Sequence, residues 1–295
     1  GNSHRRILCL HGWLDNADSF HLLGPALGSD KCGQFEVVAL DFPGHGRSSH
    51  KSKDGPTQVL FEYVFYVAEA VRQLGWDNPT ERFTLIGHSM GGGVAIAYAA
   101  AFPERVDKLV LVEGFGPLAR NAKDSSKHIR HSCQTRMKSN KALFSQVLGS
   151  DVLSATKKAR IYPNIAKAVD VRMATAKQFE QYISKEAAYA LVTRATTPVN
   201  GDGEAVIFCH DPRLNWPSIQ YSTTEQVESL ISDIECPVCC IQADNEWPIP
   251  ESQIKRALSL LKPTLHKKLP GSHHLHADPD SFDEVLVCVQ QFLSN

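Results

Sequence analysis

The sequence predicts an α/β fold built on a mostly parallel sheet. Short apolar runs recur along the chain, and stretches with helical spacing of apolar residues separate them. The short runs are apolar throughout rather than alternating, which is typical of strands buried on both faces of a parallel sheet. Strands and helices in regular succession indicate the α/β class.

Each strand is predicted from an apolar run and from what ends it. Residues 6–10 form the first run, which stops at His11-Gly12, and residues 36–41 form the second, which stops at Phe42-Pro43-Gly44. Further strands are expected over residues 83–86, 108–112, 238–242 and 264–269. The strand ends carry Gly, Pro or polar residues, as expected where a chain leaves a sheet.

Three helices are predicted between or after these strands. Residues 57–74 carry apolar side chains at helical spacing, from Leu60 to Leu74. Residues 90–101 are rich in Ala and Gly, which predicts a helix packed closely on the sheet. A last helix is expected over residues 280–293.

Residues 117–235 break the alternation of strands and helices. This stretch has no clear buried strand, is polar, and is mostly helical in pattern, for example over residues 174–182 and 224–231. It is too long for a loop. We expect a helical lid inserted over the strand ends, with residues 1–116 and 236–295 forming the core.

Composition and charge exclude several classes of protein. The 295 residues are 42% apolar and 21% charged, which is ordinary globular usage. Lys and Arg number 31 and Asp and Glu 32, so no basic excess points to nucleic acid. No apolar run approaches the roughly 18 residues of a membrane span. The oligomeric state is not predicted.

The eight cysteines are expected to be reduced thiols. Cys236, Cys239 and Cys240 form a C-x-x-C-C cluster that suggests metal, but no second Cys/His pair stands at zinc spacing. The cluster lies at the start of an expected buried strand, where a free cysteine packs as a small apolar residue. Reduced thiols and the absence of a visible signal peptide favour a cytoplasmic protein.

The strongest chemical signal is Gly87-His88-Ser89-Met90-Gly91. It matches G-x-S-x-G and lies between an expected strand and an expected helix, the context that a nucleophile elbow requires. We predict that Ser89 is the nucleophile and that the backbone N–H of Met90 stabilises an oxyanion. A structural turn is the alternative. A dinucleotide motif is disfavoured, because Ser89 occupies the position of its second Gly.

A second oxyanion donor is predicted in His11-Gly12-Trp13, at the end of the first strand. We assign the backbone N–H of Trp13 to this role, and its indole is a candidate pocket residue. A core tryptophan beside a turn is the alternative interpretation.

Three histidines after the last expected strand are candidates for the base that activates Ser89. They lie in Gly271-Ser272-His273-His274-Leu275-His276. We favour His273, with His274 as the alternative, and expect His276 to help shape the pocket. The order Ser, acid, His is the one expected for this arrangement. A metal site at these histidines is disfavoured, because no carboxylate stands at a fixed motif spacing beside them.

Two regions offer the acid that orients the base. Glu113 ends the run at 108–112, and Glu246, or Asp244, follows the run at 238–242. Both regions lie at the carboxyl edge of the sheet, where such folds place their sites. We favour Glu113, because an unpaired carboxylate is costly to bury after a wholly apolar run.

These motifs together resemble a known family. The residues Leu10-His11-Gly12-Trp13-Leu14-Asp15-Asn16, residues 41–48 (D-F-P-G-H-G-R-S), residues 87–91 and residues 271–276 are similar to motifs of the α/β-hydrolase superfamily, over essentially the whole chain. The first motif looks most like serine hydrolase-like proteins and related bacterial esterases.

The resemblance implies an α/β-hydrolase fold and supports an acid at Glu113. Ser89 stands where dehalogenases and epoxide hydrolases have Asp, so those reactions are not implied. The family has two strands before the H-G strand, so we expect an N-terminally truncated form. Residues 209–218 resemble a lid segment, in which Arg213 and Trp216 line the pocket or form a structural turn.

The expected function is hydrolysis of a small-molecule carboxylic ester or related acyl compound through Ser89, His273 and Glu113, with no metal or organic cofactor. Thioester or carbon–carbon hydrolysis on the same triad, and a ligand-binding relative with little turnover, are the alternatives.

Overall fold

A six-stranded parallel sheet forms the centre of the molecule, as predicted. The structure is a computed structural model that describes residues 5–29, 35–52, 59–147, 160–199 and 203–295. The strand order is β2-β1-β3-β4-β8-β9, and every neighbouring pair is parallel. The strands are β1 (Arg5–Leu10), β2 (Phe35–Leu40), β3 (Phe83–His88), β4 (Val106–Val112), β8 (Val238–Asn245) and β9 (Leu265–Ser272). All six expected strands are therefore confirmed.

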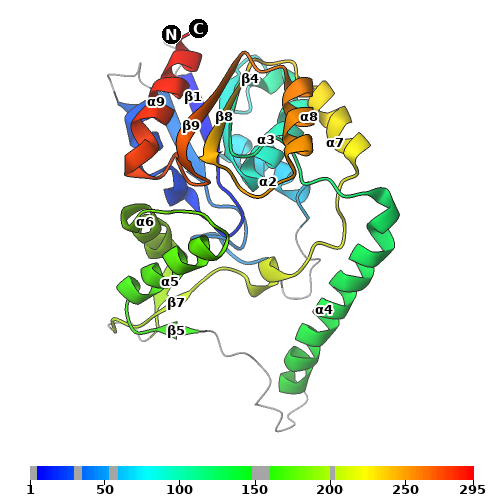
Figure 1. The fold of residues 1–295 in the computed structure, drawn as a ribbon, viewed down its shortest axis with the longest axis vertical. Coiled ribbons are helices and arrows are strands. Elements are labelled where there is room, and N and C mark those ends of the chain that lie inside the picture. Colours follow the sequence, from blue (N-terminus) through cyan, green and yellow to red (C-terminus); the bar gives the residue numbers. More distant parts are fainter. Residues whose placement is uncertain (1–4, 30–34, 53–58, 148–159, 200–202) are drawn as a thin grey trace.

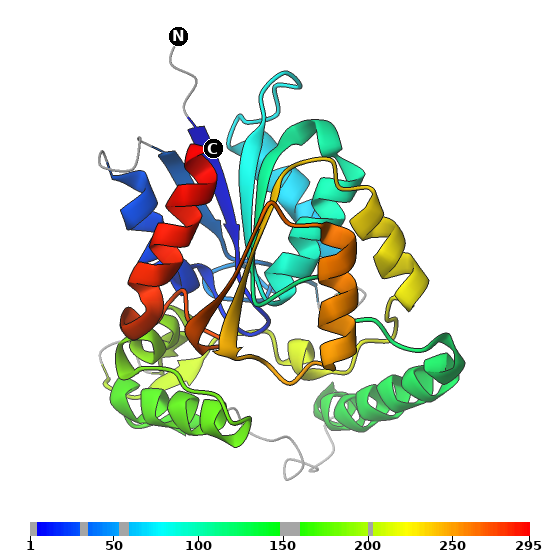
Figure 2. The same cartoon turned by 45° about the horizontal axis from the view of Figure 1, so that its top comes forward.

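Helices cover both faces of this sheet (Figure 2). One face carries α1 (Leu23–Gly28) and α9 (Pro279–Ser294), and the other carries α2 (Glu62–Gln73), α3 (Met90–Ala101), α7 (Thr224–Ser232) and α8 (Glu251–Leu261). Side chains of β1 alternate between the two apolar clusters. Ile7 and Cys9 pack with the α1/α9 layer, whereas Leu8 and Leu10 pack with the α2/α3 layer. Burial on both faces explains why the strand sequences are apolar throughout.

The strand order reverses direction between β1 and β3. From β1 the chain moves outward to β2, and then crosses to β3 on the other side of β1. Such a reversal opens a crevice where open α/β sheets bind their ligands. The segments that leave β1 and β3 there are His11-Gly12-Trp13 and Ser89-Met90.

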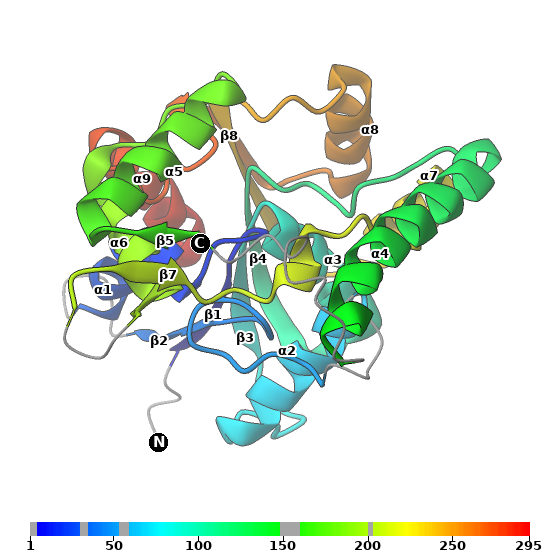
Figure 3. The same ribbon diagram turned by 90° about the horizontal axis from the view of Figure 1, so that it is seen from below.

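The segment between β4 and β8 folds as a separate layer at that end of the sheet (Figure 1). It contains α4 (Ser125–Val147), α5 (Ile165–Gln178) and α6 (Lys185–Ala195), and α4 extends away from the rest of the molecule (Figure 3). An apolar cluster that includes Val169, Leu191 and Val206 joins α5 and α6 to a small sheet.

This layer refines the expectation of a helical insertion. The sequence predicted no clear buried strand here, and the structure adds a small antiparallel sheet of partly exposed strands, made of β5 (Ile161–Tyr162), β7 (Val206–Phe208) and β6 (Thr196–Pro198). Strands of two or three residues are too short to show a hydrophobic period. The helix expected over 174–182 ends at Gln178, because Glu180 takes a left-handed conformation with φ 58°.

The last helix of the 117–235 range packs on the core. α7 begins with a capping box, in which Thr223 and Gln226 each accept the other's backbone N–H. Its buried residues Val227 and Ile231 belong to the same apolar cluster as α2 and α3. α7 is therefore part of the helical layer that covers the α2/α3 face of the sheet.

Arg213 holds a structural turn. Its guanidinium pairs with Asp211 at 2.7 Å and donates to the backbone oxygens of Lys51 and Ser52 at 2.6 and 2.8 Å. These contacts tie the inserted layer to the segment after β2. The structural-turn interpretation of residue 213 fits this geometry.

The cysteine cluster is divided between the two faces of the sheet. Cys239 packs in the α1/α9 layer with its Sγ 4.0 Å from Cys288 Sγ, whereas Cys240 packs in the α2/α3 layer. Seven cysteines are free thiols, and Cys32 lies outside the described residues. Among the described helices, none is both long and apolar enough to cross a membrane.

Candidate active site

Ser89 lies on a sharp turn between β3 and α3. Its backbone is left-handed, with φ 53° and ψ −118°, which is strained for a residue with a side chain. A Cβ on Gly87 would lie 2.6 Å from the Gly91 oxygen, and one on Gly91 would lie 2.0 Å from the Leu10 oxygen. The two outer glycines of the motif are therefore required by close backbone approach.

The groups expected to stabilise an oxyanion lie around this turn. Met90 is the first residue of α3, so its N–H is among the helix N–H groups that have no partner within the helix. A Cβ on Gly12 would lie 3.2 Å from Ser89 Cβ, so the loop that carries Trp13 runs beside the serine. The Trp13 indole is 53% exposed and donates to the Leu214 oxygen at 3.1 Å. This exposure does not fit a core tryptophan.

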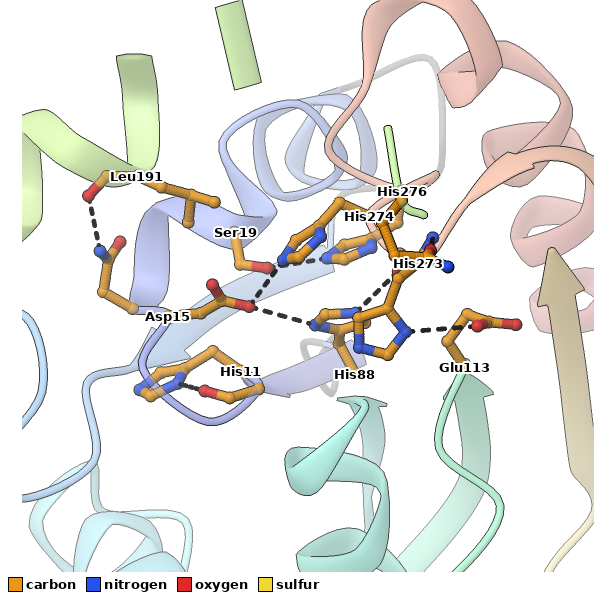
Figure 4. Close-up of polar contacts among 12 residues, drawn as sticks. His11, Asp15, Ser19, His88, Glu113, Leu191, His273, His274 and His276 are labelled. Carbon is orange, nitrogen blue, oxygen red and sulfur yellow. Dashed lines mark hydrogen bonds and ion pairs between the residues drawn. The ribbon is translucent and has the colours of Figure 1, made fainter. Parts of the chain in front are cut away.

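Glu113 and His273 face each other at the edge of the sheet (Figure 4). Oε2 of Glu113 lies 3.3 Å from Nδ1 of His273, and both residues are buried. The carboxylate is fixed by two backbone donors, because Oε1 accepts the Ala243 N–H at 2.7 Å and Oε2 accepts the Trp247 N–H at 3.2 Å. Glu113 itself has a left-handed backbone, with φ 52°.

Burial dominates the electrostatics of this pair. It raises the pKa of Glu113 to about 7, although the Ala243 and Trp247 N–H groups lower it. Burial, with a smaller contribution from the neighbouring His274, lowers the pKa of His273 to about 3. His273 is therefore neutral at neutral pH and able to accept a proton.

The backbone of His273 is held on both sides. Its N–H donates to Oε1 of Gln181 at 3.0 Å, and its oxygen accepts from Nε2 of His88 at 2.9 Å. Gln181 also donates to the Glu246 oxygen at 3.1 Å, and the Trp247 ring lies 5.1 Å from the His273 ring. Gln181 thus connects the segment that carries His273 to the loop that carries Trp247, one of the two backbone donors to Glu113.

The alternative acids have other partners. Glu246 accepts from Gln242 Nε2 at 2.5 Å and lies 3.8 Å from Lys268 Nζ, and Asp244 is exposed. Neither carboxylate contacts a histidine of the 273–276 segment among the described contacts. The structure therefore brings His273 together with Glu113.

The alternative histidines also have other partners. His274 contacts Asp15 through Nε2 at 3.0 Å, and Nε2 of His276 lies 2.8 Å from Ser19 Oγ (Figure 4). His276 is fully buried with its ring 4.2 Å from the His88 ring, and its part in shaping the pocket stays a prediction. Among the described contacts, no hydrogen bond joins Ser89 to His273, and such contacts often tighten only with substrate.

Comparison with known proteins identifies the family of this chain. The family model described as the alpha/beta hydrolase fold matches residues 5–279. The chain belongs to the α/β-hydrolase family. This membership confirms the resemblance predicted from the motifs, and it supports a hydrolase.

Individual relatives extend the match over nearly all of this α/β-hydrolase. A serine hydrolase-like protein of Danio rerio is 31% identical, over 97% of this chain and 82% of that protein. The crystal structure of a hypothetical protein from Pseudomonas aeruginosa is similar with a TM-score of 0.79 and 32% identity, over 100% of this chain and 93% of that one. An esterase from Mycobacterium tuberculosis, at 16% identity, shares the fold with a TM-score of 0.62, over 100% and 86% of the two chains.

Three buried groups of this α/β-hydrolase have the geometry of a metal set. The ligand atoms of Asp15, His88 and His274 lie within 4.8 Å of one another. The Arg172 guanidinium already lies 2.8 Å from Asp15 Oδ1 and 3.3 Å from His274 Nε2. Although burial raises the pKa of Asp15, His274 and Arg172 lower it well below its usual range. Arg172 therefore supplies the positive charge that this carboxylate requires.

Three residues near the candidate base, Asp15, Arg172 and Gln181, have no role predicted from the sequence. Asp15 was part of the quoted L-H-G-W-L-D-N motif, and that motif was the available signal for it. Arg172 and Gln181 lie in the inserted layer, more than 90 positions before the histidines that they contact. No motif marks them.

Proposed function

We propose that this chain is a serine hydrolase that cleaves a carboxylic ester or a related acyl compound. The observation that carries the proposal is the buried Glu113–His273 pair, 3.3 Å apart, beside a serine on a strained elbow. Nucleophile, base and orienting acid are thus supplied by three strand ends of one sheet edge, in the order required for this chemistry.

In the first half of the reaction, Ser89 Oγ attacks the carbonyl carbon of the substrate. His273 Nε2 takes the hydroxyl proton, and Glu113 stabilises the imidazolium through Nδ1. The negative charge that forms on the carbonyl oxygen is bound by the N–H groups of Met90 and Trp13. His273 then gives the proton to the departing alcohol, and the acyl group stays on Ser89.

In the second half, water attacks the acyl carbon. His273 removes a proton from the water, the bond from the acyl carbon to Ser89 Oγ breaks, and the proton returns to the serine. The products are an alcohol and a carboxylic acid. Every step uses side chains and backbone groups of this chain.

The relatives' names support the same reaction class. Similar proteins include serine hydrolase-like proteins, an esterase and a thioesterase domain. A panel of aryl esters, thioesters and β-diketones therefore serves to identify the bond that is cleaved, since all three would acylate Ser89.

Fluorophosphonate labelling read by intact mass tests the proposal. We expect one adduct on the wild type and none on Ser89→Ala, together with loss of p-nitrophenyl butyrate hydrolysis. Ser294→Ala, an exposed serine on α9, is the matched control and keeps the adduct. Full turnover by a folded Ser89→Ala variant would contradict the proposal. A ligand-binding protein would instead return a bound ester intact.

A further inference from the structure

A cavity lies next to Glu113. It has a volume of about 280 Å³ and lies between α7, α8 and the loop that follows β4. Its walls are mainly apolar and include Phe115, Val227, Ile231, Ile254 and Leu260. The lining includes Glu113 and Trp247 but neither Ser89 nor His273, so the cavity adjoins the catalytic pair through Glu113 without including the nucleophile or the base.

The charged groups of the lining are already paired. Arg256 is bound by Glu228 through two hydrogen bonds, of 2.7 and 3.0 Å. Glu246 is engaged by Gln242, and Glu113 by two backbone N–H groups and His273. Three carboxylates and one paired guanidinium leave no cation in the described lining to bind an anion. An anionic ligand would lose its hydration without gaining a partner. Each carboxylate of the described lining already has a partner, which a cationic ligand would have to displace.

The volume sets the size of a neutral ligand. An apolar cavity of about 150 Å³ holds a benzene molecule, which has six non-hydrogen atoms. By proportion, about 280 Å³ holds roughly eleven such atoms. A chain of eight to ten carbons with one hydroxyl group has this size.

We propose that this cavity binds a neutral, mainly apolar small molecule, of the class of medium-chain alcohols, as a site separate from the one that turns over substrate. The mainly apolar walls and the absence of an unpaired cation select this class. The site goes beyond the proposed function, because it requires only the cavity and not Ser89.

Glu113 belongs to both the cavity wall and the catalytic pair, and Trp247, also in the cavity wall, contacts both members of that pair. The Trp247 ring lies 5.1 Å from the His273 ring, and its backbone N–H donates to Glu113. A ligand that packs on Trp247 therefore acts on the orientation of Glu113. We expect bound alcohol to change kcat of the wild type by about twofold or more without displacing substrate.

Isothermal titration calorimetry of the protein with 1-octanol, and separately with octanoate, tests the proposal. The two probes have the same chain length and differ in charge. The full chain is used in two forms, free and with Ser89 blocked by a fluorophosphonate. Ala257→Trp fills the cavity from α8, and Val287→Trp, on α9 where the side chain is 62% exposed, is the matched control. If Ala257→Trp does not melt cooperatively, Ser252→Trp, an exposed lining position on the same helix, replaces it.

The expected result is saturable binding of 1-octanol with a Kd on the order of 0.1 mM. Blocking Ser89 leaves this Kd within twofold, Ala257→Trp raises it at least tenfold, and Val287→Trp does not change it. Octanoate binds at least tenfold more weakly.

Three results would overturn the proposal. Equal binding of octanoate contradicts the charge argument. Loss of octanol binding on blocking Ser89, with no effect of Ala257→Trp, places the alcohol in the reacting centre. Absence of octanol binding excludes the site. If Ser89 proves unreactive, the free chain and its two Trp variants still decide the outcome.

Discussion

Glu113→Gln is the change that separates the two candidate acids. The substitution keeps the size of the side chain and removes its charge. His273 is neutral before reaction, so the attraction between carboxylate and imidazolium exists only once the proton has moved. At 3.3 Å and an effective dielectric constant of about 20, that attraction is about 5 kcal/mol. Its loss corresponds to a fall in kcat of between 10³- and 10⁴-fold, on the order of 5,000.

The assay is p-nitrophenyl butyrate hydrolysis at pH 8.5, where a Glu113 carboxyl with a pKa of about 7 is ionised. Glu246→Gln is the matched control, because that carboxylate contacts Gln242 and Lys268 rather than a histidine. We expect it to lower kcat by less than tenfold. Thermal melting of both variants checks the fold. A folded Glu113→Gln variant that keeps more than a tenth of wild-type kcat would refute the reasoning, as would a larger loss in Glu246→Gln.

Three further predictions concern pH, backbone packing and the inserted layer. Burial raises the pKa of Glu113 to about 7, and only its ionised form stabilises the imidazolium, so we expect kcat/KM to rise with pH through about 7 and to be level above it. In Glu113→Gln we expect the residual rate to be flat from pH 5 to 8.5. An unchanged rise in that variant would show that ionisation of Glu113 is not the cause of the pH dependence. Gly91→Ala puts a methyl group 2.0 Å from the Leu10 oxygen, so we expect it to abolish cooperative melting, whereas Gly24→Ala, whose nearest neighbour is 3.9 Å away, melts within a few degrees of the wild type. Gln181→Ala frees the His273 N–H, and we expect kcat to fall by about tenfold with KM little changed; a change confined to KM would assign Gln181 to substrate binding instead.

The sheet and the elbow were predictable because their signals are local. Each buried strand is a continuous apolar run, and the G-x-S-x-G motif lies within five consecutive residues, although one of the close approaches that require its glycines comes from Leu10 in β1. Glu113 was favoured over Glu246 on the cost of burying a lone carboxylate, and Glu113 is the carboxylate that the structure places against His273.

The contacts around the base were not predictable, because folding rather than sequence spacing brings their members together. Gln181 lies 92 positions from His273, and Arg172 lies 157 positions from Asp15. A polar residue in a polar segment shows no hydrophobic period from which its neighbours could be inferred. The strands β5, β6 and β7 escaped prediction because two or three residues are too few to show a hydrophobic period.

The position of Gln181 bears on how this chain can be rebuilt. Inserted layers of α/β proteins are attractive parts to delete or exchange, since the sheet and the helices that cover it hold the two larger apolar clusters. Here the exchange would remove the acceptor of the His273 N–H and the Arg172 partner of Asp15, both of which the insertion supplies. A grafted insertion from another protein therefore has to bring an amide and a guanidinium to the same two places. In evolutionary terms, the insertion and the histidine segment are expected to have changed together rather than as interchangeable modules.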